Sequence, residues 1–157
     1  MRAVLQRVLS ASVEINRQES RPIGPGLVVF LGVLKGDTPS LAKLLAEKIA
    51  GLRVFPDEQD KLNLSLADTG GEVLAVSNFT LGTDCKKGRR PSFDMAAPPE
   101  EARTLYERFV QELRALGVRV ATGEFGAYMR VTAENDGPVT LILDTEKLGK
   151  RPKENVQ

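Results

Sequence analysis

Histidine is absent from the 157 residues of this chain. A Ser-His-Asp or Cys-His catalytic arrangement is therefore excluded, and so are zinc sites built on imidazole ligands. If the protein is a hydrolase, its proton transfers must come from a carboxylate, a lysine, main-chain groups or the substrate itself. We expect neither a metal ion nor a cofactor.

Cysteine and long apolar runs are scarce or missing as well. The single cysteine, Cys85, excludes a disulfide within the chain and suits a reducing compartment, so we expect a cytoplasmic location. No apolar run approaches the roughly 20 residues needed to span a membrane, and the N-terminal segment lacks the apolar core of a signal peptide. We expect no association with a membrane.

Neither sign of charge is in excess, since 22 Lys and Arg face 21 Asp and Glu for a formal net charge of +1. This balance gives no global attraction to nucleic acid, so any basic surface must be local. The length, with 41% hydrophobic and 27% charged residues, fits one globular domain. We expect this domain to cover residues 1–145 and a charged tail, 146–157, to fray.

Apolar periodicity predicts about eight strands and two helices. Alternation predicts strands at 2–8 and 11–15, and the run 27–34, apolar on both faces, is typical of a central strand. Helices are expected after Thr38-Pro39 and after Pro98-Pro99, where prolines precede apolar stripes. Hairpins outnumber crossovers, which favours a layered, largely antiparallel α+β domain with curved, barrel-like sheets and both helices on one face.

A hairpin is expected near the C-terminus, with strands at 128–134 and 139–144 and the tip at 135–138. Asp-Gly is ordinary hairpin chemistry, but Pro138 has no N–H to give the ladder and restricts Gly137 before it. The tip cannot close as a simple two-residue turn, so its main chain is presented to another group. The alternative is a proline that is only structural.

The segment 72–81 is predicted to be a strand that is apolar at first and polar from Ser77 onward. A rigid strand ending in Ser77-Asn78-Phe79-Thr80 presents binding groups without the entropy cost of a loop. The structural alternative is that Phe79 fills the core and that Ser77 and Thr80 bond to nearby main chain.

A local cluster of cations lies in the segment 82–98, which is too rich in polar residues, glycine and proline for regular structure. Its members are Lys86, Lys87, Arg89 and Arg90. Such a cluster could hold phosphates, although cations without interleaved aromatic residues are more often a solvated loop.

Together, Ser-Asn-Phe-Thr-Leu at 77–81 and Asn-Asp-Gly-Pro-Val-Thr at 135–140 resemble the motif pair of the D-aminoacyl-tRNA deacylases. In that family the pair usually reads Ser-Gln-Phe-Thr-Leu and Asn-x-Gly-Pro-Val-Thr, so Asn78 departs from the pattern. Further landmarks lie at consistent spacing along most of the chain, at 5–8, 24–32, 53–55, 88–93, 105–106 and 122–129.

The resemblance implies a homodimer that hydrolyses the ester between a D-amino acid and the 3′-terminal adenosine of tRNA. Gly137 and Pro138, joined by a cis bond, would reach into the partner's site and hold the substrate α-amino group through main-chain carbonyls. Arg7 would support this pair, and L-aminoacyl-tRNA would be rejected. Glycyl-tRNA mischarged on a non-cognate tRNA would also be a substrate.

The resemblance further implies catalysis by main chain and RNA. The N–H groups of Phe79 and Thr80, beside Ser77, would stabilise an oxyanion while the ribose 2′-hydroxyl assists the attacking water. Asn78 and Met129 would contact the substrate. Contacts with the acceptor end of tRNA are assigned to Lys86, Lys87, Arg89 and Arg90.

Two other functions remain open from the sequence. One is a non-catalytic RNA-binding module, in which the cations contact the acceptor stem and the Gly-Pro tip only positions the end. The other is an acyl hydrolase with Thr80 as nucleophile and a lysine as base, although no histidine is available to activate Thr80.

Overall fold

Residues 1–148 are the part of the chain described by this computed structural model. The strands are β1 (Arg2–Ile15), β2 (Glu19–Ile23), β3 (Gly26–Gly32), β4 (Phe55–Pro56), β5 (Leu62–Leu64), β6 (Glu72–Ser77), β7 (Arg119–Thr122) and β8 (Met129–Asp144). The helices are α1 (Pro39–Gly51), α2 (Leu66–Thr69) and α3 (Pro99–Ala115), with 3-10 turns η1 (Phe79–Leu81) and η2 (Thr145–Lys147). The predicted frayed tail, 146–157, lies outside the described residues from residue 149 onward.

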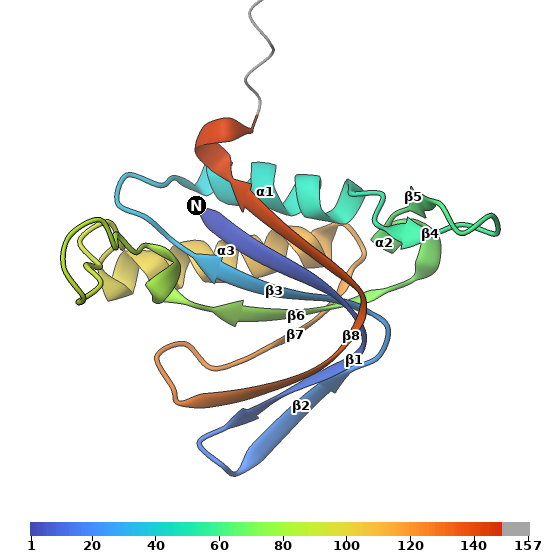
Figure 1. Ribbon diagram of the computed structural model, residues 1–157, viewed down its shortest axis with the longest axis horizontal. Coiled ribbons are helices and arrows are strands. Elements are labelled where there is room, and N and C mark those ends of the chain that lie inside the picture. Colours follow the sequence, from blue (N-terminus) through green and yellow to red (C-terminus); the bar gives the residue numbers. More distant parts are fainter. Residues whose placement is uncertain (149–157) are drawn as a thin grey trace, which may run out of the picture.

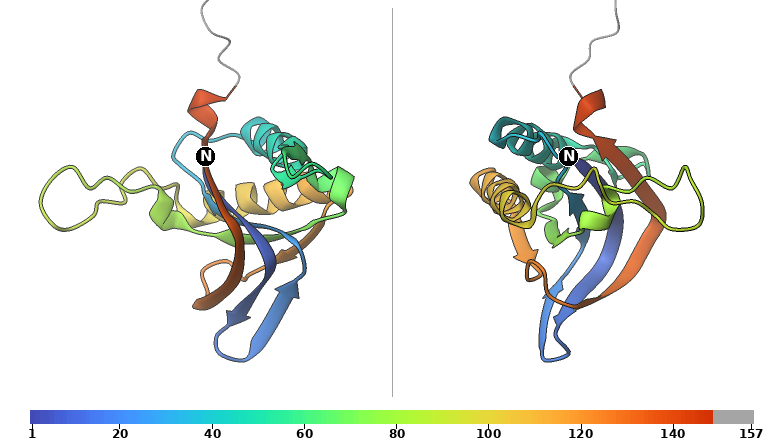
Figure 2. Two further views of the ribbon diagram at one scale, coloured as in Figure 1. Left: turned by 45° about the vertical axis from the view of Figure 1, so that its right-hand side comes forward. Right: turned by 90° about the vertical axis from the view of Figure 1, so that its left-hand side faces the viewer.

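Six strands form one sheet in the order β2-β1-β3-β6-β7, with β8 paired to β1, and β4 pairs with β5 separately. The pairs of β1 with β2, β3 and β8 are antiparallel, whereas β6 is parallel to both β3 and β7. The sheet curves strongly and is almost closed on itself (Figures 1 and 2). The predicted α+β class, with largely antiparallel and barrel-like sheets, is confirmed.

The strand β1 is continuous, so the prediction of separate strands at 2–8 and 11–15 is wrong. Its first half pairs with β3, from Arg2↔Gly32 to Val8↔Gly26, and its second half pairs with β2, from Ala11↔Ile23 onward. On its other edge β8 follows it along almost the whole length. The chain therefore bends between two neighbours without leaving the sheet, and this bend helps to curl the sheet.

The strand β8 also replaces the predicted C-terminal hairpin, which is wrong. Val8 pairs with Asn135 and Gln6 pairs with Thr140, so residues 136–139 bulge out opposite the single residue Arg7. A bulge tolerates Pro138, because the extra residues give no hydrogen bonds to the ladder. The Asp-Gly-Pro sequence thus interrupts the pairing of one long strand and does not reverse the chain.

The two long helices pack side by side on one face of the sheet, as predicted (Figure 1), and the four-residue helix α2 adds to them. Pro99 occupies the first turn of α3, and Glu100 and Glu101 lie favourably near the positive end of the helix dipole. The apolar stripe of α3 is buried as predicted: Ala102, Leu105, Tyr106, Phe109, Val110 and Leu113.

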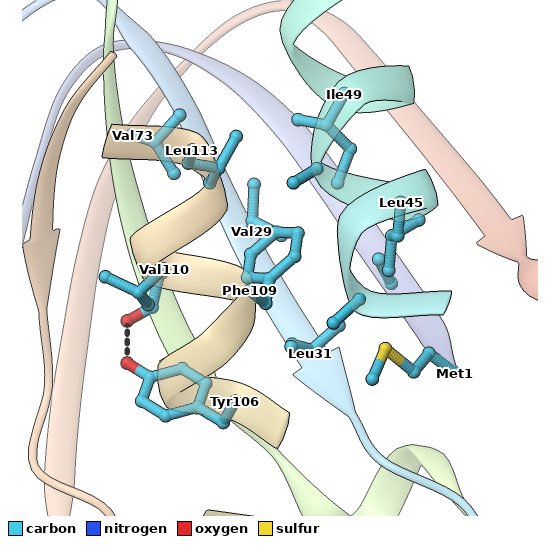
Figure 3. Packing of buried hydrophobic residues seen from close by; sticks show 14 of the residues in the cluster. Met1, Val29, Leu31, Leu45, Ile49, Val73, Tyr106, Phe109, Val110 and Leu113 are labelled. Atoms are coloured by element: carbon cyan, nitrogen blue, oxygen red, sulfur yellow. Dashed lines mark hydrogen bonds between the residues drawn. The ribbon is translucent and has the colours of Figure 1, made fainter. Parts of the chain in front are cut away.

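The main core lies between this face and the helices (Figure 3). Phe109, fully buried, lies among Val29, Leu31 and Leu45 from the sheet and α1. The Tyr106 hydroxyl donates a hydrogen bond of 2.8 Å to the carbonyl of Ala75 in β6, which ties α3 to the central strands. None of the helices in residues 1–148 has the length and apolar character needed to cross a bilayer.

Candidate functional site

The central strand β6 ends at Ser77, and the chain then turns into η1, so the predicted strand over 72–81 is too long. The Asn78 amide still donates to the carbonyl of Leu31, at 2.8 Å, and this bond anchors the start of the turn on the end of β3. A Cβ atom at Gly32 would lie 2.7 Å from the Cβ of Leu81. Glycine at this position therefore lets η1 pack against the sheet.

Two amides at the start of η1 are unbonded. The turn is closed by two main-chain hydrogen bonds. The N–H of Leu81 donates to the carbonyl of Asn78 at 3.3 Å, and the N–H of Gly82 donates to the carbonyl of Phe79 at 3.0 Å. Within residues 1–148, the N–H groups of Phe79 and Thr80 donate to no acceptor. The first amides of a helical turn lack partners in the turn, so adjacent main-chain donors are available here for an oxyanion.

A cavity of about 660 Å³ opens beside these residues. Its walls come from the loop before α1, the end of β6, the segment that leads into α3, and the turn before β8. The lining residues are Lys35, Ser77, Asn78, Phe79, Phe93, Ala96, Ala97, Pro98, Pro99, Ala102, Phe125, Gly126, Ala127 and Met129. Among these described residues Lys35 alone is ionisable, and an apolar cavity with a few polar groups is typical of a small-molecule site.

The hydroxyl of Thr80 lies in a local network outside the cavity lining. It donates to the side-chain oxygen of Asn78, while the hydroxyl of Thr83 donates to the Thr80 carbonyl. These contacts stabilise the turn that carries the two unbonded amides.

The predicted Gly-Pro motif lies in the bulge of β8 and does not line the cavity of its own chain. The Gly137-Pro138 bond is cis, and both residues are exposed. Gly137 has a φ of +135°, which favours glycine. Arg7 is buried against the bulge, where its Nε donates to the carbonyl of Asp136 at 3.0 Å and lies 3.2 Å from the Asp136 carboxylate.

The predicted site residues thus fall into three groups. One group shares the cavity: Ser77, Asn78, Phe79 and Met129. A second lies at the bulge: Arg7, Gly137 and Pro138. The third occupies an exposed loop that projects from the body of the protein (Figures 1 and 2): Lys86, Lys87, Arg89 and Arg90.

That loop is closed at its base by two hydrogen bonds of 2.8 Å between the main chains of Asp84 and Ser92. Its four cations form no ion pair within residues 1–148. They are therefore available to an external anion. In the same described range, no group of three or more His, Cys, Asp or Glu is placed to hold a metal ion.

Most of the lining residues had no predicted role in the site, among them Lys35, Phe93 and Phe125. Phe93 and Phe125 lie in landmark stretches of the resemblance, but nothing in their local sequence indicates that they meet. The cavity brings them together because the loop before α1, the end of β6, the segment that leads into α3 and the turn before β8 all contribute to its walls.

Comparisons with known proteins place this chain among deacylases. The family described as D-Tyr-tRNA(Tyr) deacylase matches residues 4–144. The D-aminoacyl-tRNA deacylase of Pelobacter propionicus is 60% identical over 144 residues, covering 92% of this chain and 99% of that protein. The corresponding protein of Heliobacterium modesticaldum is 58% identical over 144 residues, covering 92% and 96%.

Two solved structures are also similar. The c-Myc DNA Unwinding Element Binding Protein has a TM-score of 0.85 and 42% identity, covering 92% of this chain and 98% of its own. A probable eukaryotic D-amino acid tRNA deacylase has a TM-score of 0.80 at 20% identity, covering 90% and 97%, and shares the fold.

Proposed function

Since the chain belongs to the D-Tyr-tRNA(Tyr) deacylase family, we propose that it hydrolyses the ester bond of D-aminoacyl-tRNA and releases free D-amino acid and tRNA. The observation that carries this proposal is the pair of unbonded amides at Phe79 and Thr80, next to a cavity lined by Ser77 and Asn78. A tRNA substrate and a single exposed cysteine fit a reaction in the cytoplasm.

In the proposed reaction, water attacks the ester carbonyl carbon and the bond to the ribose oxygen breaks. The two amides donate to the oxyanion, and one proton of the water passes to the departing ribose oxygen with help from the 2′-hydroxyl. Removal of one such donor typically lowers kcat by about 10²–10³-fold. The chain supplies no histidine for this transfer, so the substrate hydroxyl takes that role.

Selection of the D configuration is assigned to Gly137 and Pro138 of a second subunit. These residues are exposed and do not line the cavity of their own chain, which supports action across an interface. Main-chain carbonyls that hold the α-amino group leave one direction open for the side chain, so an L side chain would collide with the backbone. Glycine has no side chain to collide, and glycyl-tRNA on a non-cognate tRNA is therefore a second substrate.

The edge strand β8 supports a two-fold dimer. Within residues 1–148, it pairs only with β1 and so leaves its other edge unpaired. Ile142 on β8 is 78% exposed, and Leu9 on the neighbouring strand β1 is 48% exposed. Unpaired, apolar strand edges usually associate, and a two-fold axis would place each bulge near the other subunit. Sedimentation at micromolar concentration would contradict this assembly if it found a monomer.

The decisive experiment compares deacylation of matched D- and L-tyrosyl-tRNA by the wild type and two variants of Phe79. Phe79→Pro removes the amide hydrogen at the first position of η1, where a fixed φ is tolerated. Phe79→Leu keeps that hydrogen and removes only the ring. We expect the wild type to release the D-amino acid, Phe79→Pro to lose about 10²-fold or more in kcat, and Phe79→Leu to lose much less.

Release from neither substrate by the wild type would overturn the proposed activity and favour an RNA-binding module. Equal losses in the two folded variants would show that the amide of Phe79 is not used. Urea unfolding of both variants provides the control for folding.

A further inference from the structure

Two exposed phenylalanine rings stand together at the mouth of the cavity. Phe79 is 58% exposed and Phe93 is 38% exposed, although both also line the cavity. Their ring centroids are 5.4 Å apart with an interplanar angle of 70°, an edge-to-face pair. Because these rings are exposed at the cavity mouth, they do not serve mainly to pack the core. We expect a planar apolar group of a ligand to pack against them.

The charges around this aromatic pair favour an anion. Lys35 is exposed, and its main-chain amide donates a hydrogen bond of 3.0 Å to the carbonyl of Met95. This bond fixes the loop before α1 against the segment that carries Phe93. Within residues 1–148, no acidic side chain lines the cavity. Acids adjoin the lining in sequence at Asp37, Asp94, Glu100 and Glu124. The Asp37 carboxylate accepts hydrogen bonds from the N-terminal ammonium at 2.8 Å and from the amide of Leu34 at 2.6 Å.

The cationic loop begins immediately beside the same pair. Ser92, which closes the base of that loop through Asp84, directly precedes Phe93. Aromatic faces next to a strip of cations are the combination that binds single-stranded nucleic acid, since bases stack on the rings while phosphates meet the charges. Base-paired RNA would bury its base faces and could not use the rings.

From this juxtaposition, we propose that the mouth of the cavity binds the unpaired nucleotides that precede the terminal adenosine of the substrate. A base stacks on the ring of Phe93, which Phe79 supports edge-on. Lys35 contacts the phosphate at the point where the RNA strand emerges from the cavity. The inference rests on the proposed function, because the terminal aminoacylated nucleoside must occupy the cavity. It adds that the enzyme requires a single-stranded 3′ end.

The test uses four substrates: D-tyrosyl-adenosine, a D-tyrosylated trinucleotide ending in CCA, D-tyrosyl-tRNA, and a D-tyrosylated duplex whose 3′ end is base-paired. The wild type should turn over the trinucleotide and tRNA with kcat/KM at least about tenfold above that for D-tyrosyl-adenosine, because stacking contributes to binding. The paired duplex should lose this gain.

Phe93→Leu should lower kcat/KM on the trinucleotide and on tRNA about tenfold more than it lowers kcat/KM on D-tyrosyl-adenosine, because only the longer substrates have a base to stack on the ring. Phe93→Tyr, which retains an aromatic face, should restore the gain. Lys35→Met should lower the slope of log kcat/KM against log salt by about 0.7 on the trinucleotide. Lys43→Met, an exposed lysine of α1, is the matched control and should leave the slope unchanged.

Equal losses on adenosine and tRNA in Phe93→Leu would overturn the inference, because the ring would then only shape the cavity. No loss on any substrate would overturn it as well. Binding of a fluorescent, non-acylated single strand ending in CCA separates this inference from the proposed function. If the wild type hydrolyses none of the substrates but binds the strand in a manner that depends on Phe93, the proposed function is overturned while the proposed nucleotide binding at the cavity mouth is supported.

Discussion

Arg7 donates a hydrogen bond of 3.0 Å from Nε to the main-chain carbonyl of Asp136, the residue before Gly137. Its Nη1 donates to the carbonyl of Val54 at 2.8 Å. One buried guanidinium in β1 therefore holds the bulge of β8 and the segment before β4 at the same time. The position of the Gly-Pro motif depends on a side chain 129 residues away in the sequence.

Replacing Arg7 by methionine should destabilise the protein and lower its activity. The change leaves the buried carbonyl of Val54 without its donor, which costs about 1–3 kcal/mol, and the part-buried carbonyl of Asp136 also loses its donor. Urea unfolding measures the stability, and kcat/KM on D-tyrosyl-tRNA measures the activity. Arg7→Lys keeps the charge but not the forked geometry of the guanidinium, so its stability and activity should lie between those of the wild type and Arg7→Met. An Arg7→Met protein with wild-type activity would show that the bulge keeps its conformation without the hydrogen bond from Arg7.

Replacing Gly137 by alanine should reduce activity on D-tyrosyl-tRNA at least about tenfold while the fold persists. A Cβ atom here would lie 2.7 Å from the nitrogen of Val139, and the φ of +135° is unfavourable for alanine, at roughly 1–3 kcal/mol. The bulge must therefore shift, and its carbonyls shift with it. Gly117→Ala, at φ +84° and with open space around it, is a matched control that should keep full activity. Unchanged activity in Gly137→Ala would place substrate selection elsewhere.

The sequence predicted those features that depend on local pattern. The stripe of α3, the α+β class and the family of the chain are confirmed, because each follows from periodicity or from residues in short motifs. The hairpin at 135–138 was wrong, since Asp-Gly-Pro gives a local turn signal whereas the bulge is set by pairing with β1. The cavity could not be predicted, because its walls come from four separate segments.

Tyr106 should make stability depend on pH in the alkaline range. Burial raises the pKa of its phenol to about 12, above the ordinary value of 10. The neutral phenol is thus favoured in the folded state, so its contribution is complete below pH 10 and is lost as the pH rises towards 12. The loss approaches roughly 2–3 kcal/mol at 1.36 kcal/mol per pKa unit.

Tyr106→Phe tests this dependence. At pH 7 the variant should be less stable by about 1 kcal/mol, because the hydrogen bond to Ala75 is missing. Between pH 10 and 12 its free energy of unfolding should fall less steeply than that of the wild type. Tyr128→Phe, at a ring that is 58% exposed, is the control and should follow the wild type throughout. Parallel curves for Tyr106→Phe and the wild type would contradict the prediction.

Neutralising the cationic loop should weaken tRNA binding without changing chiral preference. A variant with glutamine at all four positions, Lys86, Lys87, Arg89 and Arg90, should flatten the dependence of log Kd on log salt by about one unit for each phosphate that the loop no longer binds. The ratio of D to L turnover should stay the same, since phosphate contacts position the RNA and do not read the amino acid. Glutamine at Lys43 and Lys48 of α1 is the control. An unaltered slope of log Kd against log salt would show that the loop is solvated and binds no phosphate.

The role of Thr80 can be decided by separating its hydroxyl from its amide. The hydroxyl donates to the side-chain oxygen of Asn78 and lies outside the cavity lining, and the chain has no histidine to activate it. Thr80→Ala removes the hydroxyl and keeps the amide hydrogen, so turnover should remain within about tenfold if main-chain donors and the ribose supply the catalysis. Thr80→Ser keeps both groups and should match the wild type. If Thr80 were a nucleophile, Thr80→Ala would lose nearly the whole rate enhancement, and rapid quenching of the wild type would trap a D-tyrosyl ester on the protein, detectable by its mass.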